Sequence, residues 1–249
     1  HKWKKVSLEL KDMIEGDFGA AAILISYGAV MGKATFMQLF FMSFIETIFY
    51  SLNYKLGEDK LEVNDAGGSM FIHSFGAFFG VCCTWVLYFN RKKKIENHPC
   101  NKANKMSNTF AFIGTIFLWI FWPSFNTALI ESDDGRYRGI INTIYAMGGS
   151  CLGTFITTYM IHGAKLEPES MLNASICGGV CIGGSCDLLL EPYAALIIGL
   201  IGGVISTLGF EYIAACFEKG CKVFDTAKIL YLHGIPGFIG SIITAIAVA

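Results

Sequence analysis

Eight apolar runs, each close to the length of a membrane-spanning helix, follow one another along the chain and are separated by short polar connections. They occupy residues 17–32, 34–54, 66–89, 109–130, 139–162, 171–190, 193–217 and 229–249. Lipid cannot satisfy backbone N–H and C=O groups, so a spanning segment must be a helix or part of a closed barrel, and runs of about 20 residues favour helices. The sequence therefore predicts an all-α, polytopic membrane helix bundle that forms one domain over residues 1–249, with eight transmembrane helices.

The charge content agrees with a membrane location. Only 16% of the 249 residues are charged and 53% are hydrophobic, whereas a soluble domain carries about 25% charged residues. The formal net charge is -1, and no strongly basic stripe is present that could neutralise phosphates. We therefore expect contact with membrane lipids and no nucleic-acid partner.

The cysteines and glycines indicate packing and not a metal or redox site. Nine cysteines, an odd number, lie partly in apolar runs, where they are expected to be small buried side chains. Zinc-type Cys-x-x-Cys spacing is absent from the sequence, so no metal site is expected. Glycine pairs at four-residue spacing let neighbouring helices approach closely; they are Gly28/Gly32, Gly76/Gly80, Gly149/Gly153, Gly179/Gly183 and Gly199/Gly203.

The connection over residues 91–105, RKKKIENHPCNKANK, gives the orientation in the membrane. It holds six basic residues and one acidic residue. Basic connections remain on the cytoplasmic side of a membrane. We therefore expect this connection in the cytoplasm.

Two similar units place an acidic residue and a histidine eight positions apart inside nearly uncharged segments. They are Asp65 with His73, and Asp225 with His233. Ionisable groups inside a hydrocarbon layer are costly and usually mark a pathway or a site. If the interval is helical, eight residues span ~12 Å and turn the face by ~80°, so each Asp lies two turns from its His. One unit in each half of the chain suggests paired elements that meet near the membrane midplane.

Several motifs resemble one known family. They are DAGGSMFIHSFGAFFG (65–80), IGTIFLWIFWPSFNTAL (113–129), INTIYA (141–146), NASICGGVCIG (173–183) and LHGIPGFIG (232–240). Together, and in this order, they closely resemble the Rh glycoproteins of the Amt/Mep/Rh ammonium transporter superfamily. The resemblance covers almost the whole chain.

The resemblance implies a fold of eleven or twelve transmembrane helices, in two inverted halves of five, around a narrow pore. It implies three subunits, each with its own pore, in a homotrimer or an Rh heterotrimer in the plasma membrane. The chain would then be a fragment that starts just before the third core helix and ends in the tenth. The implied function is the passage of ammonia, taken from ammonium, without enzymatic activity, ATP or a bound cofactor.

The resemblance also assigns roles to six residues. His73 and His233 match the family's twin pore histidines, and Phe18 and Phe125 match the two phenylalanines of the outer mouth. Asp65 matches the carboxylate beside the ammonium access path, and Asp225 is its counterpart in the second half. Aromatic faces attract a cation by ~0.5 to 2 kcal/mol. Two neutral imidazoles can share a hydrogen bond and offer their other nitrogens to ammonia. A purely structural interpretation remains open: histidines satisfied in the core, and aspartates that cap helices.

The chain departs from the Rh pattern at two positions. Residues 227–231 replace small or polar residues of the family, and Lys228 among them leaves the electrostatics of the inner vestibule open. Glu211 lies in a span where the family has an apolar residue. The residues by themselves do not account for Glu211.

The same residues bear on three other possible functions. A non-conducting scaffold or sensor with this fold is an alternative, although the presence of both His73 and His233 argues against it. A membrane hydrolase that uses Asp and His as metal ligands or acid and base is disfavoured, because no nucleophile motif such as GxSxG is present. Carbon dioxide as a second substrate stays open.

Overall fold

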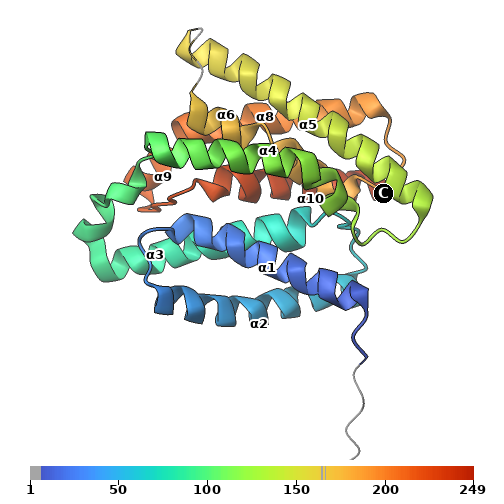
Figure 1. The fold of residues 1–249 in the computed structure, drawn as a ribbon, viewed down its shortest axis with the longest axis horizontal. Coiled ribbons are helices and arrows are strands. Elements are labelled where there is room, and N and C mark those ends of the chain that lie inside the picture. Colours follow the sequence, from blue (N-terminus) through green and yellow to red (C-terminus); the bar gives the residue numbers. More distant parts are fainter. Residues whose placement is uncertain (1–6, 164, 166) are drawn as a thin grey trace, which may run out of the picture.

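Every regular element in the part of the chain that the computed structural model describes, residues 7–163, 165 and 167–249, is helical. The long helices are α1 (Leu10–Val30), α2 (Phe36–Leu61), α3 (Phe75–Glu96), α4 (Lys105–Thr127), α5 (Asp133–His162), α8 (Pro192–Leu208) and α10 (Ile235–Val248). The shorter ones are η1 (Ser69–Ser74), η2 (Pro99–Asn101), α6 (Pro168–Ala174), α7 (Cys177–Ile182), η3 (Gly183–Ser185), η4 (Gly209–Ile213), α9 (Ala214–Gly220) and η5 (Leu230–Gly234). Helices α1 and α2 lie on one side of the bundle and α8 on the other (Figure 1).

Six helical segments among the described residues are long and apolar enough to cross a membrane. They are Leu10–Val30, Ser69–Asn90, Lys105–Thr127, Asp133–His162, Pro192–Gly220 and Leu230–Val248. Each coincides with one of the eight predicted runs, with ends shifted by up to about two helical turns. The predicted fold class, an all-α membrane bundle, is confirmed.

The other two predicted runs differ from the six. The run 34–54 forms the continuous 26-residue helix α2, but Gln38, Glu46 and Asn53 make it more polar than the six. The run 171–190 is not one helix, because it is divided among α6, α7 and η3. The single spanning helix predicted there is wrong.

Side chains of neighbouring helices explain the division of residues 168–185. Ser150 Oγ donates to the Ser175 carbonyl at 2.6 Å, and Ser69 Oγ donates to the Val180 carbonyl at 2.6 Å. These bonds satisfy carbonyls at the interruption and in the final turn of α7. Irregular backbone at membrane depth is tolerated where it is buried in protein, and every residue of α7 is buried.

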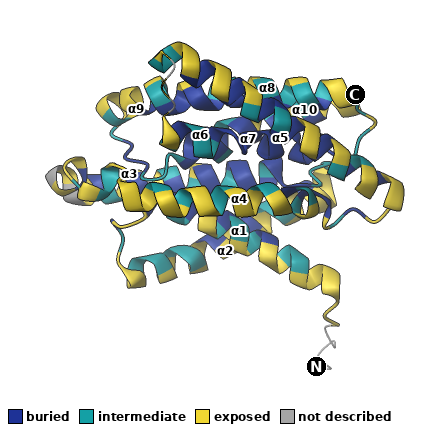
Figure 2. Ribbon diagram, turned by 45° about the horizontal axis from the view of Figure 1, so that its top comes forward, coloured by how far each residue is buried: buried dark blue, intermediate teal, exposed yellow. Residues whose placement is uncertain are grey.

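Close helix contacts hold the bundle together. A Cβ atom at Gly80 on α3 would lie 2.8 Å from Ser26 Cα on α1, and one at Gly203 on α8 would overlap the Ser150 carbonyl on α5. Only glycine permits such approaches. The buried residues gather inside the bundle around α7, while α2 and α4 carry many exposed residues (Figure 2). Exposed apolar side chains such as Phe40 and Phe117 suit contact with lipid tails.

Candidate functional site

The two histidines predicted from the sequence lie face to face in the bundle. His73 belongs to η1 and His233 to η5, and each of these is a π-helical turn that runs directly into a long helix. The imidazole rings are stacked with an interplanar angle of 7° and centroids 5.1 Å apart. Their Nδ1 atoms are 3.1 Å apart, a hydrogen-bond distance. Single π turns inside helices occur frequently at functional sites.

This geometry restricts the protons of the pair. In a hydrogen bond between two Nδ1 atoms, one ring donates its Nδ1–H and the other accepts with a bare Nδ1. Two neutral imidazoles must therefore be opposite tautomers, one with a bare Nε2 and the other with Nε2–H. The pair thus presents one acceptor and one donor on its outer edges, and no protein group in the described residues bonds His73 Nε2.

Aromatic and aliphatic side chains surround the histidines. The Trp122 ring stacks on His73 at 5.7 Å, and the Phe125 ring is 5.8 Å away at 54°. Both histidines line a cavity of about 480 Å³. Most of its other lining residues are apolar, among them Ile25, Leu118, Phe121, Ile229 and Leu232.

The two phenylalanines assigned to the outer mouth also meet. The Phe18 and Phe125 ring centroids are 4.9 Å apart, and the ring planes are tilted by 37° instead of being parallel. Phe18 lies in the first half of α1 and Phe125 near the end of α4. Because the opposite ends of these helices adjoin residues 99–104, the pair lies away from the connection expected in the cytoplasm.

Each aspartate caps the turn that carries the histidine of its unit. Asp65 Oδ2 accepts from the backbone N–H groups of Met70 and Phe71 at 2.9 and 2.8 Å, and Asp225 Oδ2 accepts from Leu230 N at 2.9 Å. The interval between Asp and His is not continuous helix, since residues 66–68 and 226–228 are non-helical. The assumed helical geometry of this interval is therefore wrong. The capping interpretation and an electrostatic role are compatible.

Burial changes the ionisation of both carboxyls, which lie in the connections outside the spanning segments. Burial raises the pKa of Asp65 to about 6, while hydrogen bonds from backbone N–H groups of 69–71 oppose the rise. Burial also raises the pKa of Asp225 to about 6, against backbone hydrogen bonds and the charge of Lys33. Asp65 lines an outer cavity of about 440 Å³ together with Glu58, Glu131 and Asp187.

Lys33 is a buried cation that the sequence indicated only as part of a connection. It is 7% exposed, and its Nζ donates to the Phe224 carbonyl and, at 3.2 Å, to Asn101 Oδ1. Burial lowers the pKa of Lys33 to about 8, and the charge of Asp225 opposes this change. Lys33 thus links the end of α1 to the connection that precedes η5.

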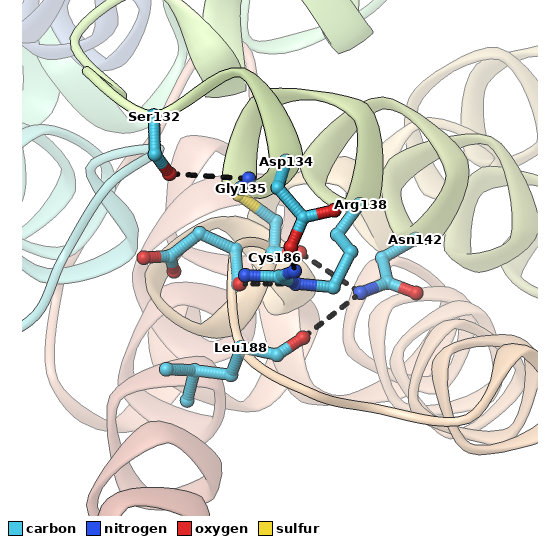
Figure 3. A network of polar contacts seen from close by, with 8 residues as sticks. Ser132, Asp134, Gly135, Arg138, Asn142, Cys186 and Leu188 are labelled. Carbon is cyan, nitrogen blue, oxygen red and sulfur yellow. Dashed lines mark hydrogen bonds and ion pairs between the residues drawn. The ribbon is translucent and has the colours of Figure 1, made fainter.

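A polar network fixes the chain near Asp65. Figure 3 shows Arg138 and Asn142 of α5 directed at residues 186–188. Arg138 Nε donates to the Asp187 carbonyl at 3.0 Å, and Asn142 Nδ2 donates to the Cys186 carbonyl at 2.8 Å. Asn64 Nδ2 donates to Asp187 Oδ1 at 3.1 Å, which extends the network to the neighbour of Asp65. This network was not predicted from the sequence; the four-residue spacing of Arg138 and Asn142, which places both on one helix face, is the signal that could have indicated it.

The two residues that depart from the Rh pattern have partners. Lys228 Nζ lies 3.2 Å from Glu169 Oε1 on α6. Glu211 Oε2 lies 3.0 Å from His162 Nε2, without hydrogen-bond geometry. Glu211 is therefore accompanied by an imidazole at the end of α5.

Comparison with known proteins gives consistent matches. A model of the Ammonium Transporter Family matches residues 2–249. Ammonium transporter Rh type B of Mus musculus is 40% identical over 245 residues, which are 98% of this chain and 53% of that protein. Ammonium transporter Rh type C of Rattus norvegicus is 40% identical over 98% of this chain and 49% of that protein. The chain thus spans about half the length of these curated relatives.

A solved structure of a related protein has a similar fold. The Rh50 protein of Nitrosomonas europaea, described as one of the Rhesus protein family of channels, superimposes with a TM-score of 0.87 and 32% identity. The match covers 96% of this chain and 62% of that one.

Proposed function

The chain belongs to the ammonium transporter family, and on that premise we propose that it carries the pore of a protein that conducts ammonia across a membrane. Ammonium is recruited near Asp65 at the outer side, meets Phe18 and Phe125, and transfers its proton to water on that side. Ammonia then passes His73 and His233. The observation that supports this proposal most directly is the stacked histidine pair, with its Nδ1 atoms 3.1 Å apart in a largely apolar cavity.

Solvation energies favour a neutral permeant. Moving a small cation without water into an apolar lumen costs many kcal/mol, whereas an uncharged amine is far less costly to transfer. The opposite tautomers of His73 and His233 offer an acceptor and a donor, and ammonia has three N–H groups and one lone pair. Ammonia can therefore bond with either edge of the pair in turn, without a net charge in the pore.

The outer residues suit the attraction of a cation. The outer cavity is lined by carboxylates including Glu58 and Asp65. The Phe125 ring contacts both Phe18 and His73, and Leu129, one helical turn further along the chain, lines the outer cavity. An aromatic face attracts a cation while the ring itself excludes ions from the lumen. The two sets of groups thus favour ammonium outside and ammonia inside.

We further propose that the protein works as a homotrimer or an Rh heterotrimer in the plasma membrane. The exposed apolar side chains of α2 and α4 supply surface for lipid or for neighbouring subunits. Crosslinking of the protein in its native membrane would reveal the number of subunits.

The test is ammonia flux in liposomes. The reconstituted protein is mixed rapidly with an ammonium salt, and the internal pH is followed by fluorescence. We expect a faster initial rate than in empty liposomes, and a rate near that of empty liposomes for His73→Ala and His233→Ala. His98→Ala, which alters a histidine in the cytoplasmic connection, is the matched control.

Two outcomes separate the alternatives. Uptake should equilibrate with the pH gradient and not concentrate ammonia beyond it, because the proposed pore needs no energy source. A folded, assembled protein whose rate equals that of empty liposomes would support a non-conducting scaffold or sensor instead.

A further inference from the structure

Lys228 occupies a backbone position that suits glycine. Its φ is +53°, in the left-handed region where a Cβ atom is unfavourable. The corresponding position of the first unit, three residues after the Asp and five before the His, is Gly68 with φ +70°. The second unit therefore keeps the backbone shape of the first but adds a long cationic side chain. A non-glycine residue in this conformation is a reason to look for a function.

The side chain is held by a carboxylate and an aromatic ring. Lys228 Nζ lies 3.2 Å from Glu169 Oε1 and 5.4 Å from the centroid of the Phe210 ring. Both charged side chains are about three-quarters buried, at 23% and 26% exposure. The pair lies in a cavity of about 320 Å³ that Glu211 and Glu218 also line.

This pair lies beside the pore cavity, in a separate cavity, and is not part of the pore lining itself. The neighbours of Lys228 in the chain, Ala227 and Ile229, line the cavity that contains both histidines. Asn173 on α6 lines the same cavity, and Glu169 precedes it by one helical turn, with Asn173 Nδ2 donating to the Glu169 carbonyl at 2.7 Å. The ion pair thus connects two elements that both border the pore, on the side of the cytoplasmic connection.

The chemistry of the pair resembles that of the proposed substrate. The lysine ε-ammonium is an alkylated ammonium ion, and a carboxylate with an aromatic face is a set of groups that binds small ammonium ions. We propose that Lys228 and Glu169 form an inner gate in which the tethered ammonium of Lys228 occupies a subsite for ammonium or methylammonium. This inference rests on the proposed function, because it assigns the inner end of the same pore.

The gate acts by competition. Ammonium at the inner side can reach Glu169 and Phe210 only by displacing Lys228, so the lysine lowers the occupancy of the subsite. Lys228 does not hinder uncharged ammonia, because ammonia carries no charge with which to displace the lysine from the Glu169 carboxylate. Removing the lysine should therefore create a cation site and increase ammonium occupancy at this end.

Lys228→Gly is the informative variant, since glycine removes the cation and suits the left-handed backbone. Lys222→Gly is its matched control: Lys222 lies in the same connection, has φ +59°, and forms an ion pair with Glu96 at 3.5 Å. Neither lysine lines the pore cavity itself, but both chain neighbours of Lys228 line it and those of Lys222 do not. Lys228→Gln provides a second test that keeps the length of the side chain.

The first readout is thermal unfolding of the purified protein in methylammonium chloride or choline chloride at equal ionic strength. In Lys228→Gly, methylammonium at ten times its dissociation constant should raise the ratio of folded to unfolded protein about tenfold over choline. Wild type and Lys222→Gly keep only the outer groups that attract a cation, so they should show the same, smaller difference between the two salts. Adding Glu169→Gln to Lys228→Gly should return the difference to that of wild type.

Equal responses of Lys228→Gly, Lys228→Gln and Lys222→Gly to the two salts would overturn the gate. The binding measurement does not depend on conduction, so it separates the gate from the proposed function. Liposomes with wild-type protein that conduct no better than empty ones would refute the function, whereas conducting protein without the salt effect would refute only the gate.

Discussion

At the scale of single residues, three charged side chains near the histidine pair lie in connections and not in the middle of long helices. Asp65, Asp225 and Lys33 all precede or follow a helix, where backbone N–H and C=O groups are free to bond them. Each carboxylate fixes the start of a turn that carries a histidine. Charge and backbone geometry are therefore coupled on both sides of the pore.

Asp225 gives a prediction about pH. Its pKa of about 6 in the folded protein exceeds the value near 4 of an unfolded aspartate. The folded state then binds the proton more strongly between pH 4 and 6, so the stability contributed by this group falls as pH rises through that window and stays low above it. The Asp225→Asn variant has no carboxyl to ionise at this position, so it does not lose stability in this way. Its free energy of unfolding relative to that of wild type should rise by roughly 1–3 kcal/mol from pH 4 to pH 6.

Unfolding of the two proteins in denaturing detergent at several pH values measures the difference. Asp59→Asn, which changes an exposed carboxylate of α2, is the control and should leave the pH profile unchanged. A constant difference between Asp225→Asn and wild type over this window would contradict the prediction.

Phe125 gives a prediction about conduction. Its ring contacts Phe18, His73 and Trp122, but it is only half-buried. Phe125→Ala should change the ammonia rate in liposomes or admit water, while costing less stability than the ~3 to 5 kcal/mol of a fully buried phenylalanine. Unchanged rates with a stability loss in that range would identify Phe125 as a core residue.

At the scale of helices, the length of the apolar runs predicted the elements well where each run forms one continuous helix. The runs 109–130 and 139–162 correspond to α4 and α5. Two features escaped prediction. The interruption of residues 168–185 depends on distant hydroxyls of Ser69 and Ser150, which satisfy carbonyls around it. The turns that carry His73 and His233 are π-helical, a form that apolar length does not indicate.

Helix packing predicts opposite effects at two adjacent glycines of α5. A Cβ atom at Gly149 would overlap the Leu196 carbonyl of α8, whereas one at Gly148 would meet nothing within 4 Å. Gly149→Ala should therefore separate the helices and destabilise the protein by roughly 1–3 kcal/mol. Gly148→Ala should be neutral or stabilise it by up to about 1 kcal/mol, since alanine favours helix. Thermal unfolding in detergent measures both, and equal effects would refute the packing argument.

At the scale of the whole molecule, two similar units from the two halves of the chain meet at one site. The pairing of the units was predictable from the repeated Asp-to-His spacing, whereas the roles that the family motifs assign to the six residues stay predictions. The position of Lys33 was not predictable, because a lysine in a connection usually points to water. Its burial depends on acceptors about 70 and 190 residues away.

Lys33→Met tests how strongly this residue joins the units. The change leaves the Phe224 carbonyl and Asn101 without their donor and removes a positive charge near Asp225. We expect a loss of roughly 2–4 kcal/mol in the free energy of unfolding. Lys55→Met, at a side chain that is 78% exposed, should change it by less than about 0.5 kcal/mol. Similar losses for both variants would show that Lys33 is not a structural link.

The π turns make the spacing between Asp and His a fixed length. A π turn accommodates one residue more than an α turn, and each residue of a helix rotates the chain by about 100°. Deleting one residue from η1 would swing His73 away from its twin while leaving the composition of the segment almost intact. The number of residues between each Asp and its His is therefore expected to matter more for the histidine pair than the identity of the residues in between.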